Sequence, residues 1–163
     1  MGQAYEFKCK CGYSFTPFLG VGFMFVQQYN DVKESAIKGE FGEELKAFFA
    51  EHPEGAINAE VVVGRCKKCG KYESFPNLSM YLPINVEENE KGRWSVPVPS
   101  EGAAYVAPWD LEESYKLYET YQHKCKSCGG DMDILTEKDL VESGIICPEC
   151  GKTIECGANI MWD

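Results

Sequence analysis

The sequence predicts a small, mainly β protein of the α+β class, built from β-hairpins with one or two short helices. Three observations support this prediction. Of the 163 residues, 44% are apolar and 13% aromatic, too many for intrinsic disorder and enough for one medium or two small cores. Short aromatic or β-branched runs alternate with turn residues. Eight of the nine cysteines form four close pairs, each in a predicted turn.

The N-terminal half holds short predicted strands and one predicted helix. The helix spans residues 42–51, because Leu45, Phe48 and Phe49 share one side and Pro53 stands beyond its end. The strands are aromatic or β-branched and bounded by turns, and they cover residues 5–9, 13–15, 59–63, 72–75 and 78–82. The helix then lies as an insertion between strands.

The C-terminal half opens on a second predicted helix and continues in strands. Asp110 and Glu113 have the spacing of a capping box, which predicts a helix running to about Tyr121. One face of this helix would carry Leu111, Tyr115 and Tyr118. Further along, Thr136 is predicted to cap one helical turn that runs through Leu140. The predicted strands cover residues 132–135, 144–147, 153–156 and 158–162.

A polar stretch rich in Pro and Gly, residues 86–102, is typical of a boundary between modules. We therefore expect an N-terminal module over residues 1–85, a connector over 86–102 and a C-terminal module over 103–163. The connector region carries Trp94 and Trp109, which we interpret as candidates for an exposed contact surface.

Each cysteine pair is followed at once by glycine, so the chain repeats a short C-x(1–2)-C-G unit. After a tight turn that holds two sulfurs, the backbone needs a positive φ to point its N–H groups back at the thiolates, and glycine adopts that conformation without strain. The repeated unit therefore indicates four turns built to present sulfur. The pairs are Cys9 and Cys11, Cys66 and Cys69, Cys125 and Cys128, and Cys147 and Cys150.

Two such turns supply four thiolates, which is the ligand set of a closed structural zinc site. The four cysteines of the C-terminal half have the spacing of one such site, a zinc ribbon. The four cysteines of the N-terminal half are then assigned to a second site partly by elimination, across a gap of 54 residues between Cys11 and Cys66. Pairings that cross the two modules stay open, because four pairs combine into two sites in three ways. The sequence thus predicts two Zn²⁺ ions, with iron as the alternative metal.

The C-terminal stretch HKCKSCGG…IICPECGK resembles zinc-ribbon proteins with rubredoxin-type knuckles over about 45 residues. The resemblance implies metal binding but no particular function. The N-terminal stretches FKCKCGYSF and GRCKKCGKYESFPNLSMYLP resemble the bacterial CpXC domain family, which is uncharacterised. This chain has Cys-Lys-Cys where that family carries Cys-Pro-x-Cys.

Three residue classes outside the pairs need an interpretation. The ninth cysteine, Cys156, is expected to be a buried core thiol, with a substitute metal ligand or a reactive thiol as alternatives. His123 precedes Cys125 by two positions; we expect a half-exposed strand residue, with metal ligation or orientation of a thiolate as alternatives. Basic residues flank all four pairs. We interpret them as compensation for the negative charge of two zinc–tetrathiolate sites, with a nucleic-acid contact surface as the alternative.

The net charge of −10 is concentrated in the second half of the sequence. Residues 1–80 carry ten acids and nine bases, whereas residues 81–163 carry sixteen acids and seven bases. An acidic surface disfavours binding to nucleic acid or to an anionic membrane, because both depend on Lys and Arg. No secretory signal or membrane-spanning run is found, so we expect a cytoplasmic protein whose cysteines bind metal instead of forming disulfides.

No catalytic constellation is recognised. The sequence lacks a Gly-rich phosphate loop, a nucleophile elbow and an H-E-x-x-H motif. Three functions from different classes remain. The first is a protein-interaction or adaptor module whose partner is another protein. The second is a nucleic-acid-associated factor that uses the basic residues around the pairs. The third is a rubredoxin-like iron protein that carries electrons.

Overall fold

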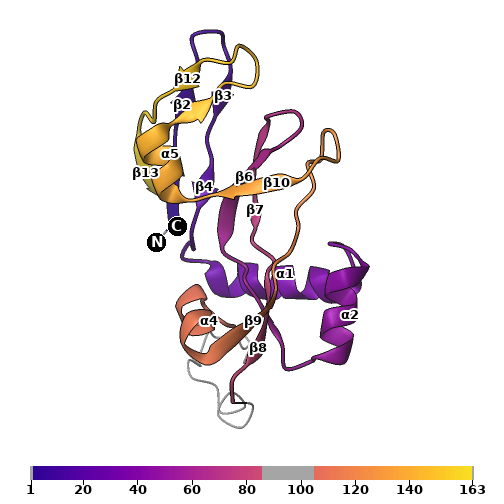
Figure 1. The fold of residues 1–163 in the computed structure, drawn as a ribbon. Coiled ribbons are helices and arrows are strands. Elements are labelled where there is room, and N and C mark those ends of the chain that lie inside the picture. The colour runs from indigo at the N-terminus through magenta and orange to yellow at the C-terminus, as the bar shows by residue number, and fades with distance from the viewer. Residues whose placement is uncertain (1, 86–104, 163) are drawn as a thin grey trace. The chain divides into compact units, whose positions relative to one another are not determined.

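The computed structural model describes residues 2–85 and 105–162 (Figure 1). Thirteen strands and four helices lie in this part of the chain, and its paired strands are antiparallel. The strand-rich α+β class predicted from the sequence is confirmed. The predicted connector over residues 86–102, with Trp94, lies outside the described residues. Within the described part, no helix is both long and apolar enough to span a membrane.

The chain divides into two compact units, and each unit is assembled from separated segments. The knuckle unit, which carries all four cysteine pairs, comprises Met1–Phe23, Glu60–Phe75 and Gln122–Asp163. The helical unit comprises Met24–Ala59 and Pro76–Tyr121. This division differs from the consecutive modules 1–85 and 103–163, because each half of the sequence contributes to both units.

Two three-stranded sheets and two short hairpins build the knuckle unit. The first sheet has the order β13-β1-β4, and the second has the order β10-β6-β7. Backbone hydrogen bonds in both directions between Gly20 and Val61, 2.9 and 3.1 Å long, link the end of β4 to β6. The strands of the sheets are β1 (Gly2–Tyr5), β4 (Phe18–Leu19), β6 (Val61–Cys66), β7 (Tyr72–Pro76), β10 (Met132–Leu135) and β13 (Asn159–Trp162).

The two hairpins have strands of two residues each. They are β2 (Phe7–Lys8) with β3 (Ser14–Phe15), and β11 (Ile145–Ile146) with β12 (Thr153–Ile154). Such short hairpins are marginal in isolation. Their inward side chains form one core together with α5 (Glu137–Ser143). This core includes Phe7, Val63, Leu140, Ile145 and Ile154.

The cap predicted at Thr136 is confirmed. The Thr136 hydroxyl accepts from the Asp139 backbone N–H at 3.1 Å, and the Asp139 carboxylate accepts from the Thr136 N–H at 2.9 Å. These two bonds satisfy donors that the first turn of a helix leaves unpaired. The helix that follows, α5, is longer than the single predicted turn, and it buries Leu140 completely.

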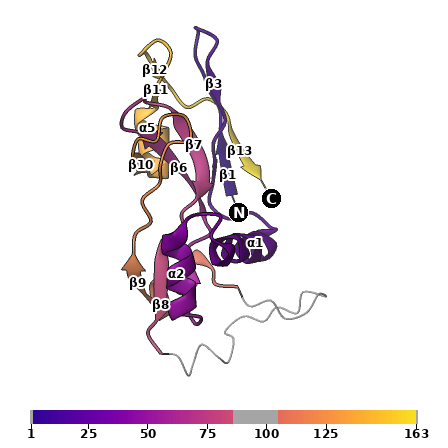
Figure 2. The ribbon, with the colours of Figure 1, turned by 90° about the vertical axis from the view of Figure 1, so that its right-hand side faces the viewer.

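The helical unit contains a long helix that was not predicted from the sequence. Helix α1 (Phe25–Lys38) packs against α2 (Glu43–Glu51), as Figure 2 shows. Its buried residues recur at helical spacing and are Phe25, Tyr29, Val32 and Ala36. At its end Gly39 adopts a φ of +84°, and the Gly39 and Glu40 N–H groups close the last turn on two helix carbonyls, each at 3.0 Å. The predicted helix at 42–51 is confirmed as α2, with its predicted side buried.

The predicted helix from Asp110 to about Tyr121 is wrong in its second half. Helix α4 (Pro108–Ser114) is followed directly by strand β9 (Tyr115–Glu119), which pairs with β8 (Met80–Pro83). The third strand of this sheet is β5 (Ala56–Ile57), on the other side of β8. The run Tyr-Lys-Leu-Tyr suits a half-buried strand as well as a helix, and pairing with β8 decides between them.

Candidate metal centres

All four cysteine pairs adopt the same closed turn, which we call a knuckle. In each knuckle the glycine N–H donates to the carbonyl oxygen of the first cysteine, at 2.8–3.0 Å. The N–H of that cysteine donates 2.8 Å across the turn to a carbonyl one residue beyond the glycine. The glycines have positive φ, as predicted: +102° at Gly12, +72° at Gly70, +68° at Gly129 and +71° at Gly151.

The shorter first knuckle keeps this closure with one residue fewer. The Gly12 N–H reaches back three residues to the Cys9 carbonyl, whereas in the other knuckles the glycine reaches back four. Gly12 has the largest positive φ of the four glycines, and this different backbone angle lets the turn close with one residue fewer. The Cys-Lys-Cys sequence is therefore compatible with a sulfur-presenting turn.

The eight predicted ligands come together in two groups of four, but not in the groups that the sequence favoured. Within each group the four sulfur atoms lie within 4.8 Å of one another. The predicted N-terminal set and the predicted C-terminal set are both wrong, and one of the crossed pairings that the sequence left open is present. We call the groups the Cys9 site, formed by Cys9, Cys11, Cys147 and Cys150, and the Cys66 site, formed by Cys66, Cys69, Cys125 and Cys128.

Strand pairing explains this crossed arrangement. Strand β10 pairs with β6 so that Met132 lies opposite Cys66, which brings the third knuckle beside the second. Strand β13 pairs with β1 along its length, and Gly2 lies opposite Trp162. The two ends of the chain therefore run side by side, and the first and fourth knuckles meet.

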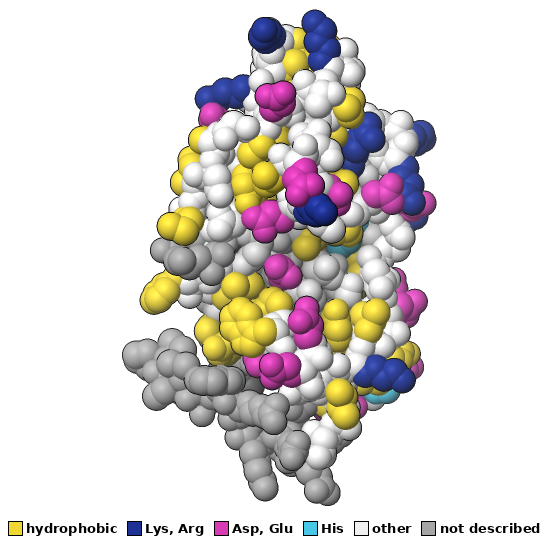
Figure 3. All heavy atoms as spheres, turned by 60° about the vertical axis from the view of Figure 1, so that its left-hand side comes forward, with side chains coloured by type: hydrophobic (Ala, Val, Ile, Leu, Met, Phe, Trp, Pro, Cys, Tyr) yellow, Lys and Arg dark blue, Asp and Glu magenta, His cyan; other side chains and the backbone are white. Residues whose placement is uncertain are grey.

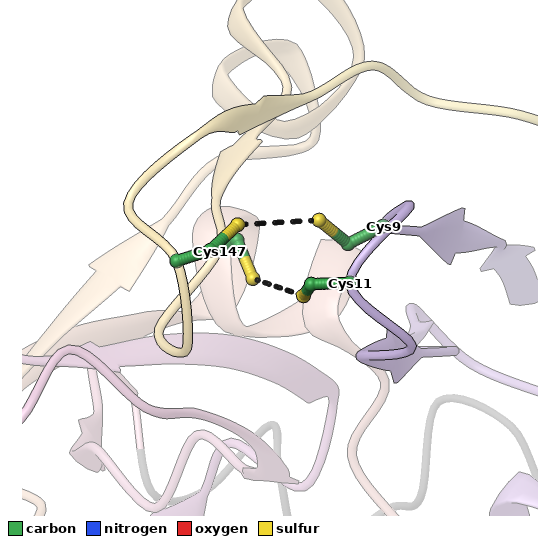
Figure 4. A group of neighbouring side chains, drawn as sticks. Cys9, Cys11 and Cys147 are labelled. Atoms are coloured by element: carbon green, nitrogen blue, oxygen red, sulfur yellow. Dashed lines mark hydrogen bonds between the residues drawn. The ribbon is translucent and has the colours of Figure 1, made fainter.

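The sulfur separations match a tetrahedral metal site. They are 3.5 Å for Cys9–Cys150 and 3.6 Å for Cys11–Cys147 (Figure 4). In the other site they are 3.4 Å for Cys66–Cys128 and 3.7 Å for Cys69–Cys125. A metal–sulfur bond of about 2.3 Å gives a tetrahedron with edges of about 3.8 Å. A disulfide would need about 2.05 Å. Each group therefore has the spacing of four separate thiolates around one ion.

Backbone donors favour the thiolate form that a metal requires. At the Cys66 sulfur, the N–H groups of Cys69 and Lys68 point at it from 3.4 and 3.3 Å and lower the pKa of that thiol to about 6. The Cys11 N–H likewise lowers the pKa of Cys9 to about 7. Burial acts in the opposite direction at Cys125 and raises the pKa of that thiol. Each site thus holds at least one thiol that is readily ionised near neutral pH.

The two sites differ in their exposure to solvent. In the Cys66 site, Cys66 and Cys125 are buried and the other two cysteines are half-buried. In the Cys9 site only Cys147 is buried, Cys9 is half-buried, and Cys11 and Cys150 are exposed. Both centres have four-sulfur ligand sets, but fully exposed cysteines occur only in the Cys9 site.

Two further predictions concern residues near the knuckles. Cys156 is half-buried against the core of the knuckle unit, and burial raises the pKa of its thiol. His123 is buried, with 8% of its surface exposed, so the half-exposed strand residue expected from the sequence is wrong. Its ring stacks on Phe75 with centroids 3.9 Å apart, which explains the burial. Within the described residues, neither side chain joins a group that could hold a metal.

The basic residues around the knuckles are largely balanced within their own unit. Lys67 lies 3.0 Å from Asp133, and Lys124 pairs with Asp131. Over the whole sequence the knuckle unit carries ten bases and eleven acids, whereas the helical unit carries six bases and fifteen acids. The acidic character of the protein therefore belongs to the helical unit, with a balance of −9 against −1.

Comparisons with protein-family models, with curated proteins and with solved structures find no match to this chain. Function must therefore be argued from the site itself. Four thiolates fill a tetrahedral coordination sphere, so a metal held in this way has no position left for a substrate. The chemistry that the two centres support is metal binding that joins distant segments of the chain.

Proposed function

We propose that both centres hold structural Zn²⁺ and that the zinc-stabilised chain acts as a protein-interaction module. The observation that supports zinc most directly is the sulfur spacing of 3.4–3.7 Å, four ligands to a site. The donor set is complete, as structural zinc sites require. Iron suits four thiolates as well, so the identity of the metal has to be measured.

Structural zinc would stabilise the knuckle unit, because its hairpins are short. Strands β2, β3, β11 and β12 have two residues each, and few backbone hydrogen bonds hold them. Binding of structural zinc contributes about 10–16 kcal/mol of apparent free energy at neutral pH. Since each proposed zinc joins two knuckles from distant parts of the chain, its binding stabilises contacts that these strands support only weakly.

Elemental analysis and colour test the metal assignment. We expect two zinc ions per chain and a colourless protein. A strong chelator should remove both and unfold the knuckle unit, which circular dichroism would report as loss of native signal. A red protein with iron in place of zinc would contradict the zinc assignment. A chain that keeps its fold without any metal would contradict the structural role.

The proposed interaction surface belongs to the helical unit. Large apolar side chains are exposed on its α4 and β9: Trp109 is 55% exposed and Leu117 is 49% exposed. Tyr118, the next residue of β9, points to the other face of the strand and packs against Phe48 and His52. Helix α4 also exposes Glu112 and Glu113, which lie three and four positions beyond Trp109 and so share its side of the helix. Figure 3 shows one face of the molecule, on which hydrophobic, acidic and basic side chains all reach the surface. The exposed Trp109 beside two acidic residues suits a basic protein segment with an apolar anchor.

Charge favours a protein partner over nucleic acid. Bound as thiolates with two Zn²⁺, the eight cysteines would take the net charge from −10 to about −14. Generic binding to nucleic acid draws its affinity from Lys and Arg on phosphates, and here several lysines are engaged by carboxylates of the same unit.

A pull-down from native lysate, with and without nuclease, tests the partner class. We expect a protein that survives nuclease, is released by salt and is lost with Trp109→Ala. Phe23→Ala is the matched control, because Phe23 is an aromatic residue 82% exposed in the other unit, and it should leave capture unchanged. Loss of all captured protein on nuclease treatment would favour nucleic acid instead, and equal effects of the two substitutions would contradict the surface.

A further inference from the structure

The two metal centres differ in how far solvent reaches their sulfur atoms. Two of the four ligands of the Cys9 site, Cys11 and Cys150, are exposed. None of the ligands of the Cys66 site is exposed. A solvent-borne reagent therefore meets two exposed cysteines at one centre and none at the other.

Packed groups cover the Cys66 site. Met132, which is 3% exposed, and Phe75 lie against its cysteines in one apolar cluster. The backbone at Gly130 approaches so closely that a Cβ there would lie 3.1 Å from the Cys66 sulfur and 3.4 Å from the Cys128 sulfur. The Cys66 sulfur also accepts N–H bonds from Lys68 and Cys69. These contacts pack the ligands of the Cys66 site against apolar side chains and backbone.

Fewer ligands of the Cys9 site are packed in this way. The apolar core of the knuckle unit includes Cys147 and packs against Cys9, but it does not include Cys11 or Cys150. All four cysteines of the Cys66 site, by contrast, belong to or pack against one apolar cluster. The two exposed ligands of the Cys9 site therefore lie outside the apolar packing.

We propose that the Cys9 site is a thiol-oxidation site for hydroperoxides, at which disulfide formation expels the metal while the Cys66 site keeps its own. This inference rests on the proposed binding of zinc at both sites. Coordination to zinc weakens all eight thiolates as nucleophiles, so access of the oxidant decides which of them reacts.

The chemistry balances with a hydroperoxide as the only co-reactant. An exposed thiolate such as that of Cys150 attacks the peroxide O–O bond; with one proton taken up, it becomes a sulfenic acid and an alcohol leaves (water for hydrogen peroxide). The Cys9 thiolate, 3.5 Å away, then attacks that sulfur, forms the disulfide and releases hydroxide. Two thiolates are oxidised by two electrons and the peroxide is reduced by two. The two thiolates that remain no longer form a closed four-sulfur set, so a zinc ion held there would be released.

Oxidation would leave the two ends of the chain joined. The sulfur separations of 3.5 and 3.6 Å in the Cys9 site both cross between the first and the fourth knuckle. A disulfide formed between either pair therefore replaces one cross-link, the metal, by another that links the same two knuckles. The expected product is a folded chain with one zinc fewer.

The test uses the full-length protein loaded with two zinc ions. Excess hydrogen peroxide is added, zinc release is followed with a chromogenic chelator, and free thiols are alkylated and mapped by peptide mass spectrometry. We expect one zinc ion to leave about tenfold faster than the other. The disulfide should link the peptide with Cys9 and Cys11 to the peptide with Cys147 and Cys150, while the Cys66 site stays alkylatable after acid release of its zinc.

Two variants sharpen the result. Cys156→Ser removes the one cysteine outside both sites and should change neither the release nor the disulfide map. Cys150→Ser removes an exposed ligand of the Cys9 site, so the disulfide between Cys9 and Cys150 cannot form, and the mapped linkage should be the one between Cys11 and Cys147. Should this chain fail to fold, the map of the unmodified protein still decides.

The outcomes separate this inference from the proposed function. Fewer than two zinc ions before oxidation would contradict the proposed function itself. Two zinc ions that leave at equal rates, or faster release from the Cys66 site, would overturn the inference and leave structural zinc binding intact. So would a first disulfide that involves Cys156.

Discussion

Gly130→Ala should damage the Cys66 site alone, for a steric reason. Gly130 does not have positive φ, so alanine meets no backbone strain there. Its Cβ, however, would lie 2.8 Å from the Lys68 Cβ and 3.1 Å from the Cys66 sulfur. Ordinary carbon contacts are about 3.5–4.0 Å, so the second and third knuckles must separate by about 0.7–1.2 Å.

That displacement is several times what metal ligands tolerate, which is about 0.2 Å in a metal–ligand distance. Overpacking of this kind costs about 1–3 kcal/mol. If the whole cost falls on the metal-bound state, the zinc affinity of the Cys66 site drops by about 5- to 150-fold. The Cys9 site, built from other knuckles, should keep its affinity.

Competition with a chromogenic chelator measures both affinities in one titration. The unmodified chain should give two tight sites, and Gly130→Ala should give one tight and one weakened site. Gly129→Asn is the neighbouring control, because asparagine tolerates the left-handed region and a Cβ at Gly129 meets no atom within 4 Å. Two unweakened sites in Gly130→Ala, or a loss that falls on the Cys9 site, would refute the steric argument.

Three further outcomes can be tested in the same protein. Leu140→Ala should lower the free energy of unfolding by about 2–5 kcal/mol, because Leu140 is fully buried, whereas Val141→Ala, at a 45% exposed neighbour, should change it by less than about 0.5 kcal/mol; urea denaturation compares them. Tyr121→Phe removes a 2.6 Å hydrogen bond to a backbone carbonyl and should lower the free energy of unfolding by about 1 kcal/mol in the same urea experiment. A change near zero would contradict that hydrogen bond. Hydrogen bonds from Thr136 lower the pKa of Asp139. The stability that Asp139 contributes is therefore present above the ordinary Asp pKa and is lost as the pH falls through the lowered value. Asp139→Asn should flatten that part of the curve of stability against pH, and an unchanged curve would contradict the cap.

Local structure could be predicted from the sequence where local chemistry determines it. The positive φ of the four glycines, the cap at Thr136 and the apolar side of α2 are confirmed. Each depends on residues a few positions apart. The prediction was wrong at residues 115–119, where pairing with β8 outweighs helix periodicity, and at His123, which is buried by stacking on the distant Phe75.

Helix α1 was missed for a related reason. Its buried positions carry Phe25, Tyr29, Val32 and Ala36, so the apolar stripe is there, but it is interrupted by polar residues and follows an apolar run. Its mean hydropathy is low, and its first turn has no side-chain cap to mark the start. The signal that could have found it is Gly39, which stands directly after the last periodic residues as a helix C-terminal glycine.

The pairing of the knuckles could not be predicted, because chain separation hardly discriminates between the alternatives. The expected pairing of the third and fourth knuckles joins Cys128 to Cys147 across 19 positions, whereas the Cys9 site joins Cys11 to Cys147 across 136. The entropy of closing the longer loop exceeds that of the shorter by only about 2 kcal/mol. Structural zinc contributes about 10–16 kcal/mol whichever four thiolates it binds.

The register of β6 with β10 and of β1 with β13 therefore decides the ligand sets, and both pairings join residues more than 60 positions apart. Metal binding and strand pairing reinforce each other in this arrangement. A knuckle that bound its nearest neighbour in sequence would have to give up a strand pairing that already holds it beside another partner. The crossed sites follow from the sheets, and the Cys9 site, whose two knuckles close hairpins with strands of only two residues, is the more exposed of the two.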